Sequence, residues 1–396
     1  MALTSEQLLK CLVPLKLVIV SNGPNSESDA IRKAIHRAFQ GGVSSPDAAD
    51  AYFAEGEDLG VSVLEVDFSL GEADARRVLK DARDSALTTL VVALLHDIPA
   101  GHYKAWLGEI DDCAQEEDPE KQVGLLPVIM VDGAWRGAIE GLDYHDLDEY
   151  SVRPSHVAAH ALALSWRLLG DEDEQLSLFI SHAKLDGLPL AHAFRNQLQN
   201  MNGMECFYDT KSIPPGSSWK GVLRRGVERS VVVALRTNLF EERAWCVQEM
   251  DWAEDFGCPL VIVEARTHLV RAREFLPTGG SPCVHVPDGN LVRILQSALR
   301  EAMRVRLFAR QVQALEVGGE INAASTLRVP RTSLATLGLR CASMAGAGQK
   351  ATHVMIPEKF REPHRRVAES LVGAYFPGVW LGTPQTLVRE LVSKLP

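Results

Sequence analysis

Between Leu176 and Val305, short apolar runs of strand length alternate with longer amphipathic stretches of helix length. The runs are rich in β-branched residues and are bounded by polar or turn-forming residues, which is typical of buried strands. Five such runs lie at residues 176–181, 205–208, 231–235, 259–263 and 282–286. Strands that alternate with helices pair in parallel, because each crossover needs about the length of a helix. The segment therefore predicts a five-stranded parallel sheet covered by helices on both faces.

The carboxyl ends of these strands are the expected place for a ligand site, as in other open parallel sheets. Ser181 and His182 end the first predicted strand, and a loop that begins at Asp209 ends the second. The helix predicted at residues 244–256 follows the third strand and brings Glu249 toward the same edge. The sequence thus predicts that these groups lie near one another.

Glu249 is the most unusual residue of this helix, because it lies among aromatic side chains. At about 100° per residue, one stripe of the helix carries Trp245, Glu249, Trp252 and Phe256. The other polar residues, Gln248, Asp251, Glu254 and Asp255, face the other way. Burying a carboxylate costs several kcal/mol unless it is paired or hydrogen-bonded. Glu249 is therefore either neutralised by an arginine, such as Arg225 or Arg243, or lines a pocket that a polar ligand enters.

Three short motifs occur in order along this segment. The first is Phe179 to Ala183 (FISHA), followed by Asp186. The second is a Pro- and Gly-containing loop with Asp209, Ile213, Pro215, Gly216 and Trp219. The third is Trp245 to Glu249 (WCVQE), which contains Trp245, Cys246 and Glu249. In this order and spacing, residues 175–306 resemble a Toll/interleukin-1 receptor (TIR) domain, which implies a flavodoxin-like five-stranded sheet. One departure from the family is Arg243, which stands where many members carry Ser.

The chemistry of such a pocket points to a glycosidic bond. A carboxylate in an aromatic-lined pocket suits a reaction in which positive charge builds on a sugar ring. One carboxylate is enough when the leaving group needs no proton, and the nicotinamide of NAD⁺ meets this condition because its ring nitrogen is already cationic.

The TIR resemblance implies the same substrate, because many members are NAD⁺ glycohydrolases whose glutamate in the WCxxE motif is catalytic. By position, Glu249 would be that catalytic residue. The residues expected to bind the nucleotide or shape the pocket are Phe179, Ser181, His182, Trp219 and Trp245. NAD⁺ would be the substrate, and neither a cofactor nor a metal is expected.

The resemblance also implies self-association, in which the loop of one TIR domain completes the pocket of the next. Such head-to-tail contacts extend into filaments. The expected role is a bacterial antiviral (antiphage) defence effector that is activated by assembly, with the flanking regions as sensing or assembly elements. The alternative is a non-enzymatic TIR scaffold for signal transduction. A serine hydrolase is rejected, because no G-x-S-x-G motif surrounds Ser181 and no acid is placed to orient His182.

Residues 1–170 also read as alternating strands and helices, which predicts a second, Rossmann-like α/β domain. Strands are expected at residues 15–21, 61–68, 87–95 and 126–131, and helices at residues 30–39, 72–84, 103–113 and 156–169. Ser28 or Asp29 is the expected cap of the first helix. His156 and His160 have the spacing of a metal-binding pair, but a third ligand is missing from the pattern.

Residues 311–396 show a weaker pattern, with frequent Gly and Ala through residues 318–348. Strands are expected at 352–356 and 379–381, and helices at 363–375 and 384–395. The region either completes the N-terminal sheet or forms a small α/β domain. Its glycine cluster, Ala345 to Lys350, lacks the full pattern of a phosphate-binding loop.

Charge and composition exclude some classes of function. The net charge of −11 argues against a protein that coats nucleic acid. The charge is uneven, since residues 301–396 contain 13 Lys and Arg against 7 Asp and Glu, a net of +6. The sequence has no apolar run of membrane-spanning length and no secretory leader, and its seven cysteines are scattered. These features predict a cytoplasmic protein with reduced thiols.

Overall fold

The structure is a computed structural model that describes residues 4–21, 25–41, 58–67, 72–95, 122–129, 153–170, 174–199, 204–207, 219–267, 281–285, 291–358, 360, 362 and 364–394. The described residues between 13 and 174 form one compact unit, and the N-terminal residues up to 12 join those from 175 onward in another. Three parallel sheets are present, one in the first unit and two in the second. Within the described ranges, no helix has both the length and the apolar character needed to cross a membrane.

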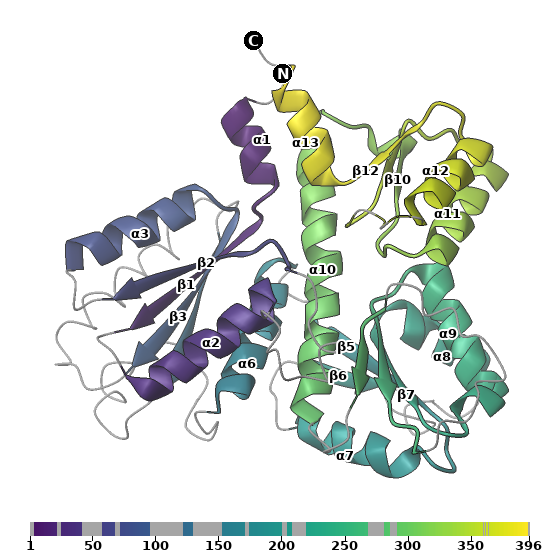
Figure 1. The fold of residues 1–396 in the computed structure, drawn as a ribbon, viewed down its shortest axis with the longest axis horizontal. Helices are drawn as coiled ribbons and strands as arrows, with labels where there is room; N and C mark the ends of the chain where they lie inside the picture. The colour runs from purple at the N-terminus through teal and green to yellow at the C-terminus, as the bar shows by residue number, and fades with distance from the viewer. Residues whose placement is uncertain are drawn as a thin grey trace. The chain divides into compact units, whose positions relative to one another are not determined.

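The first unit is a four-stranded parallel sheet with helices around it (Figure 1). Its strand order is β2-β1-β3-β4, and the strands are β1 (Leu15–Ser21), β2 (Ser62–Asp67), β3 (Thr88–Leu95) and β4 (Gln122–Ile129). Its helices are α2 (Ser26–Gln40), α3 (Glu72–Asp84) and α6 (Pro154–Leu168). α2 and α6 pack against each other, and α3 packs on β1, β2 and β3. The predicted N-terminal parallel α/β sheet is therefore present.

Two local predictions in this unit need correction. The N-cap of α2 is Asn25, whose side chain accepts a hydrogen bond from the backbone N–H of Glu27 at 2.8 Å, so neither Ser28 nor Asp29 is the cap. Ser28 is instead buried inside the helix. β4 begins four residues earlier than predicted, because Gln122 already pairs with Thr88 of β3. The helix predicted at residues 103–113 lies outside the described residues.

We expect His160 to make the folding stability of this unit depend on pH. Burial, reinforced by the nearby charge of His156, lowers the pKa of His160 to about 4. The unfolded chain has the higher pKa, about 6.5, so it binds more protons than the folded chain between pH 6.5 and 4. Stability contributed by neutral His160 is thus complete above pH 6.5 and is lost as the pH falls toward 4. We expect a loss of about 1–3 kcal/mol by pH 4.

Urea unfolding of the wild type and of His160→Gln at pH 7.5 and 4.5 measures this contribution. The variant should lose less stability than the wild type on acidification. The same loss in both proteins would contradict the assignment.

The second unit contains a five-stranded sheet of order β6-β5-β7-β8-β9, in which every neighbouring pair is parallel. The strands are β5 (Leu176–His182), β6 (Met204–Phe207), β7 (Val231–Arg236), β8 (Leu260–Glu264) and β9 (Cys283–His285). In chain order this is 2-1-3-4-5, which is the flavodoxin-like arrangement. All five predicted strands are present, within one residue of the predicted bounds at each end.

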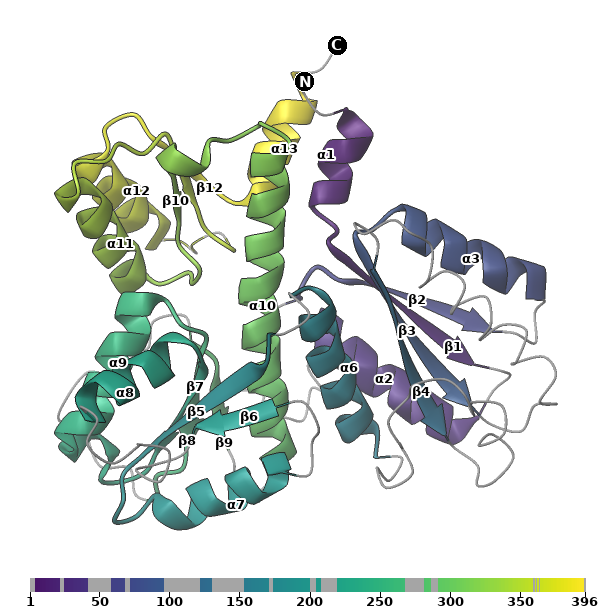
Figure 2. The ribbon, with the colours of Figure 1, turned by 180° about the vertical axis from the view of Figure 1, so that it is seen from behind.

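Helices cover both faces of this sheet (Figure 2). α8 (Trp219–Glu228) and α9 (Ala244–Phe256) pack together, and α9 lies on β5 and β7. α7 (Leu188–Gln199) and α10 (Leu291–Val317) contact each other, and α10 packs on β7, β8 and β9. A short 3-10 helix, η4 (Phe240–Glu242), leads into α9.

The C-terminal region forms a small three-stranded parallel sheet with the order β10-β11-β12. Its elements are η5 (Ala323–Ser325), β10 (Thr326–Arg328), α11 (Leu334–Gly346), β11 (His353–Met355), α12 (His364–Tyr375), β12 (Trp380–Gly382) and α13 (Pro384–Val392). α11 and α12 pack together over an apolar core that includes Val329, Leu337 and Val354. We call residues 320–394 the C-terminal subdomain. Its strands pair with one another, so they do not extend the N-terminal sheet.

The long helix α10 connects the two sheets of this unit. Its first half packs on β7, β8 and β9, and its last turns carry Phe308, Val312 and Leu315. These side chains form a core with α1 (Ser5–Cys11) and α13. The boundary predicted between residues 306 and 311 therefore falls inside a continuous helix, and residues 4–12 group with this unit although the prediction placed them in the N-terminal domain.

Candidate functional site

The carboxyl ends of β5 and β7 form the switch point of the five-stranded sheet. The chain leaves β5 toward β6 on one side and returns to β7 on the other, so the connections diverge between these two strands. His182 pairs with Leu235 at this end of the ladder. Switch points of this kind are the usual ligand sites of open α/β sheets.

Glu249 lies directly beside the end of β5. Ser181 Oγ donates a hydrogen bond to Glu249 Oε2 at 2.6 Å, and both residues are buried, with exposed fractions of 1% for Ser181 and 8% for Glu249. The Ser181 hydroxyl thus gives a hydrogen-bond donor to a carboxylate that burial has largely removed from water. The structure therefore brings together two predicted site residues that are 68 positions apart in the sequence.

Ser181 should contribute measurably to stability because of this contact. Removing its hydroxyl in Ser181→Ala takes a donor from a buried carboxylate, which costs about 1–3 kcal/mol of unfolding free energy. Ser177→Ala is the matched control, since Ser177 lies on the same strand and accepts a neutral hydrogen bond from Ser230 Oγ at 2.9 Å. We expect this control to lose about 0.5–1.5 kcal/mol. Both losses of unfolding free energy are measured in urea. If the two variants lose the same amount, the hydrogen bond from Ser181 to Glu249 is no stronger than a neutral hydrogen bond.

Cys246 lies on α9 one turn before Glu249 and is buried. Burial and the nearby charge of Glu249 raise the pKa of the Cys246 thiol to about 12, against a smaller opposing effect of a hydrogen bond with Ser181. The thiol is consequently protonated at neutral pH and is not a nucleophile. Cys246 is thus a buried, unreactive residue of the WCVQE motif.

Aromatic rings extend from this helix to the surface. Trp245 and Trp219 lie at the beginnings of α9 and α8, and their ring centroids are 4.1 Å apart with planes inclined by 54°. They are 39% and 45% exposed, whereas Trp252, 6.4 Å from Trp245, is buried. The predicted stripe is thus found, and its exposed end is a tryptophan pair. Planar rings of this kind can stack on a ligand with a flat base or ring.

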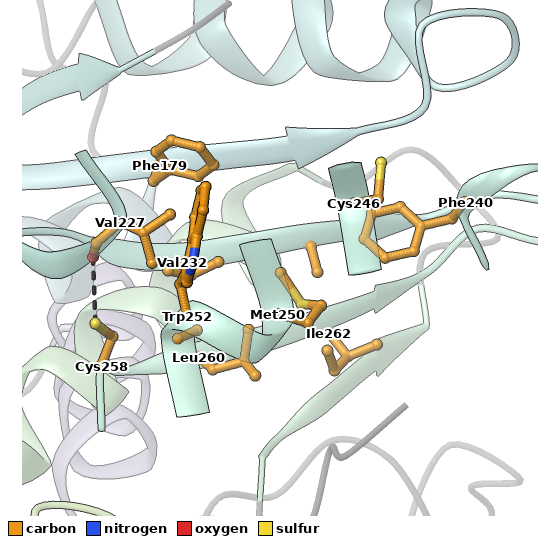
Figure 3. Packing of buried hydrophobic residues seen from close by; sticks show 12 residues of the cluster. Phe179, Val227, Val232, Phe240, Cys246, Met250, Trp252, Cys258, Leu260 and Ile262 are labelled. Atoms are coloured by element: carbon orange, nitrogen blue, oxygen red, sulfur yellow. Dashed lines mark hydrogen bonds between the residues drawn. The ribbon is translucent and has the colours of Figure 1, made fainter. Parts of the chain in front are cut away.

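Phe179 lies below the site, in the apolar core between the sheet and α9. It is 3% exposed, and Figure 3 shows its ring beside Trp252. Alternation along β5 places Phe179 and Ser181 on one face and His182 on the other. His182 Nδ1 lies 3.3 Å from the carbonyl oxygen of Ile180. Phe179 therefore supports the site from the core, and Ser181 is the predicted β5 residue that meets Glu249.

Asp186 ties the loops after β5 and β7 together, a role that the sequence did not reveal. Its two carboxylate oxygens accept hydrogen bonds from Thr237 Oγ1 at 2.8 Å and from the backbone N–H of Leu239 at 2.9 Å. Gly187 follows Asp186 at a position with little room for a side chain, because a Cβ there would lie 2.9 Å from the carbonyl oxygen of Ala183. The first motif therefore ends in a tight turn that fixes the switch point.

An ion-pair network fixes the entry into α9. Arg236 at the end of β7 pairs with Glu241 of η4 and lies 3.5 Å from Glu264 of β8. Glu264 in turn pairs with Arg266 at 2.5 Å. Arg236 and Glu264 are register partners, so their juxtaposition follows from strand pairing once the register is known. The network sets the position of η4, which leads into the helix of Glu249.

The remaining predicted residues are placed as follows. Arg243 is the N-cap of α9, without a side-chain capping bond, and Arg225 is exposed on α8. Asp209, Ile213, Pro215 and Gly216 lie outside the described residues. In the part of the chain that the structure describes, no group of three His, Cys, Asp or Glu side chains could hold a metal ion.

Comparison with known sequences agrees with this architecture. A search of curated proteins finds no match to the chain. The family model described as the TIR domain matches residues 178–271, which run from β5 through β8 and include Ser181 and Glu249. A TIR domain is accordingly present, and its match includes four of the five strands of the sheet that carries the site.

Proposed function

We propose that this protein is an NAD⁺ glycohydrolase that cleaves the bond between nicotinamide and ribose. The observation that carries the proposal is the buried Glu249 carboxylate, held by Ser181 at the switch point of a TIR domain. TIR domains are a family that includes NAD⁺-cleaving enzymes. Nicotinamide and ADP-ribose, or a cyclic form of ADP-ribose, would be the products.

The reaction needs only one carboxylate. When the glycosidic bond breaks, its electron pair moves to the ring nitrogen, so nicotinamide leaves as a neutral molecule without being protonated. Positive charge develops on the ribose, and the fixed negative charge of Glu249 stabilises it or holds the ribose hydroxyls. Water then adds to the anomeric carbon and releases a proton to the solvent. In the cyclising reaction, a nitrogen of the adenine takes the place of water.

The tryptophan pair gives the site a surface for the flat groups of the substrate. Trp219 and Trp245 are exposed next to the buried helix turn that holds Glu249. We assign them to the pocket wall, with Ser181 orienting Glu249, His182 at the strand end and Phe179 beneath. Glu249 itself is 8% exposed, so the isolated chain presents little of it to a substrate. Activation by self-association, with a neighbouring TIR domain completing the pocket, fits this enclosure.

The biological role that follows is a defence effector that depletes NAD⁺ after infection is sensed. The N-terminal α/β unit would then hold the trigger. This assignment rests on the proposed activity and on the presence of a second α/β unit in the same chain.

The alternative function is a non-enzymatic scaffold that binds other TIR domains. The same enclosure of Glu249 favours it, and so do the apolar side chains of Leu185, Trp219 and Trp245, which are 72%, 45% and 39% exposed. Such exposed apolar groups are common at interaction surfaces. The two functions differ in one measurable property, which is turnover of NAD⁺.

The test is an assay of concentrated full-length protein with NAD⁺, with and without a crowding agent. Loss of NAD⁺ and release of nicotinamide are followed by chromatography, and assembly is followed by light scattering in the same samples. Nicotinamide release that rises with assembly supports the glycohydrolase. Assembled protein that releases no nicotinamide overturns it and leaves the scaffold.

A further inference from the structure

Glu254 is buried on the side of α9 that faces away from Glu249. The sequence placed it on the polar side of the helix, yet it is 2% exposed. Its carboxylate lies 3.1 Å from Arg331 Nη1, and it accepts hydrogen bonds from Thr336 Oγ1 at 2.6 Å and Ser333 Oγ at 3.2 Å. All three partners belong to the C-terminal subdomain. One oxygen of the acid, Oε2, is thus hydrogen-bonded by two hydroxyl groups, and the other, Oε1, faces the guanidinium of Arg331 as an ion pair.

Arg331 is buried to a similar degree, with 5% exposure. Besides its ion pair with Glu254, its guanidinium donates a hydrogen bond to Ser281 Oγ, just before β9. Ser333 also caps α11, since its Oγ accepts a hydrogen bond from the backbone N–H of Thr336 at 3.3 Å. Removing one member of a buried ion pair is strongly destabilising, because it leaves the other charge without its partner. These polar contacts therefore hold the C-terminal subdomain against α9.

Further contacts lie at the carboxyl end of the same helix. Arg340 of α11 donates to the backbone carbonyl of Phe256. Gly257 ends α9 with a φ of +65°, and a Cβ there would lie 2.6 Å from Cγ of Pro330. The C-terminal subdomain therefore also contacts the carboxyl end of α9.

These contacts bear on Glu249 because a helix moves as a rigid rod. Glu249 and Glu254 are five residues apart, which puts them about 140° apart around the axis and about 7.5 Å apart along it. Ser181 holds the helix from the sheet, and Arg331 holds it from the other side. A rotation or shift of α9 would displace both carboxylates together.

We propose that Arg331 is a positioning residue for Glu249, so that the C-terminal subdomain is a built-in part of the TIR active site. The inference rests on the proposed NAD⁺ cleavage. Arg331 touches no substrate, and it acts by fixing the rotation and depth of α9 through Glu254. The C-terminal subdomain is then the route by which an event elsewhere in this unit changes the rate at Glu249.

The test compares the wild type with Arg331→Met in the full-length protein, in NAD⁺ kinetics and in hydrogen exchange of α9. The matched control is Arg328→Met, because Arg328 also lies in the C-terminal subdomain and pairs with Glu316, away from α9. We expect Arg331→Met to lower kcat about tenfold to a hundredfold with little change in KM, since a misplaced catalytic group slows chemistry at unchanged substrate contacts. Backbone amides of residues 244–257 should exchange faster, and those of α7 should not.

The outcomes are distinguishable. An unchanged kcat and unchanged exchange in α9, or equal effects in Arg328→Met, would overturn the proposal. If Arg331→Met does not fold, Glu254→Gln is judged by the same two criteria, because it keeps the size and hydrogen-bonding capacity of the side chain. If the wild type releases no nicotinamide, the proposed function fails, and exchange in α9 alone decides whether Arg331 sets the helix position.

Discussion

Replacing Glu249 by Gln should abolish nearly all NAD⁺ cleavage, with a loss of about 10²- to 10⁴-fold. The amide is close in size to the carboxylate, and its oxygen can still accept the hydrogen bond of Ser181 Oγ. What the variant lacks is the negative charge that faces the developing positive charge on the ribose. The loss should therefore appear in kcat, with folding and assembly unchanged.

Glu242→Gln is the matched control, because Glu242 is exposed on η4, just before the same helix. It removes the same charge from the same region of the chain without touching the site, so its rate should stay within about twofold of the wild type, as for most exposed substitutions. Unfolding free energies of the three proteins, measured in urea, show whether the fold is intact. A Glu249→Gln protein that keeps its rate would remove Glu249 from the mechanism.

Buried parallel strands were the part of the fold that the sequence predicted best. Runs such as Ser230 to Leu235 are apolar on both faces because helices cover both faces, and this pattern is hard to mistake for a surface element. The bounds of α9 were predicted to the residue, since Gly257 ends it in the left-handed conformation. The sequence therefore predicted an element well wherever residues within it or next to it determine where it begins and ends.

Elements defined by distant partners were predicted less well. α11 and β10 were missed, because Leu334 to Gly346 is rich in Ala and Gly and packs not only on α12 but also on α9, a helix of the TIR segment much earlier in the chain. α10 continues past residue 306, the predicted end of the TIR segment, to Val317, because α1 and α13 cover its last turns. The spacing of apolar residues along a helix does not show which other helices pack against it.

The same limit applies to the site. Glu249 was singled out because a carboxylate among tryptophans is a local anomaly, but its partner Ser181 comes from another strand. The burial of Glu254 could not be predicted from its place on the polar side of the helix. The residues that cover it, Arg331 and Thr336, lie about 80 residues further along the chain. Phe179 could have been assigned to the core from strand alternation, since it shares a face with Ser181 and lies two residues deeper in the sheet.

Gly257→Ala should destabilise the protein more than the same change at Gly60, Gly319, Gly348 or Gly378, which also have a positive φ but where a Cβ would meet nothing within 4 Å. Two costs add at this position. The left-handed backbone disfavours any Cβ by about 1–2 kcal/mol. The new methyl group would also meet Pro330 Cγ at 2.6 Å, and a proline ring cannot rotate away as a flexible side chain can. We expect a total loss of about 2–4 kcal/mol of unfolding free energy.

Gly319→Ala separates the two costs. Gly319 follows α10 with a φ of +78°, and a Cβ there would meet nothing within 4 Å. It should therefore lose only the backbone cost of about 1–2 kcal/mol. The difference between the two variants in urea unfolding measures how firmly the C-terminal subdomain is held against α9. Equal losses would mean that Pro330 yields freely in solution, and the contact could then not fix the helix that carries Glu249.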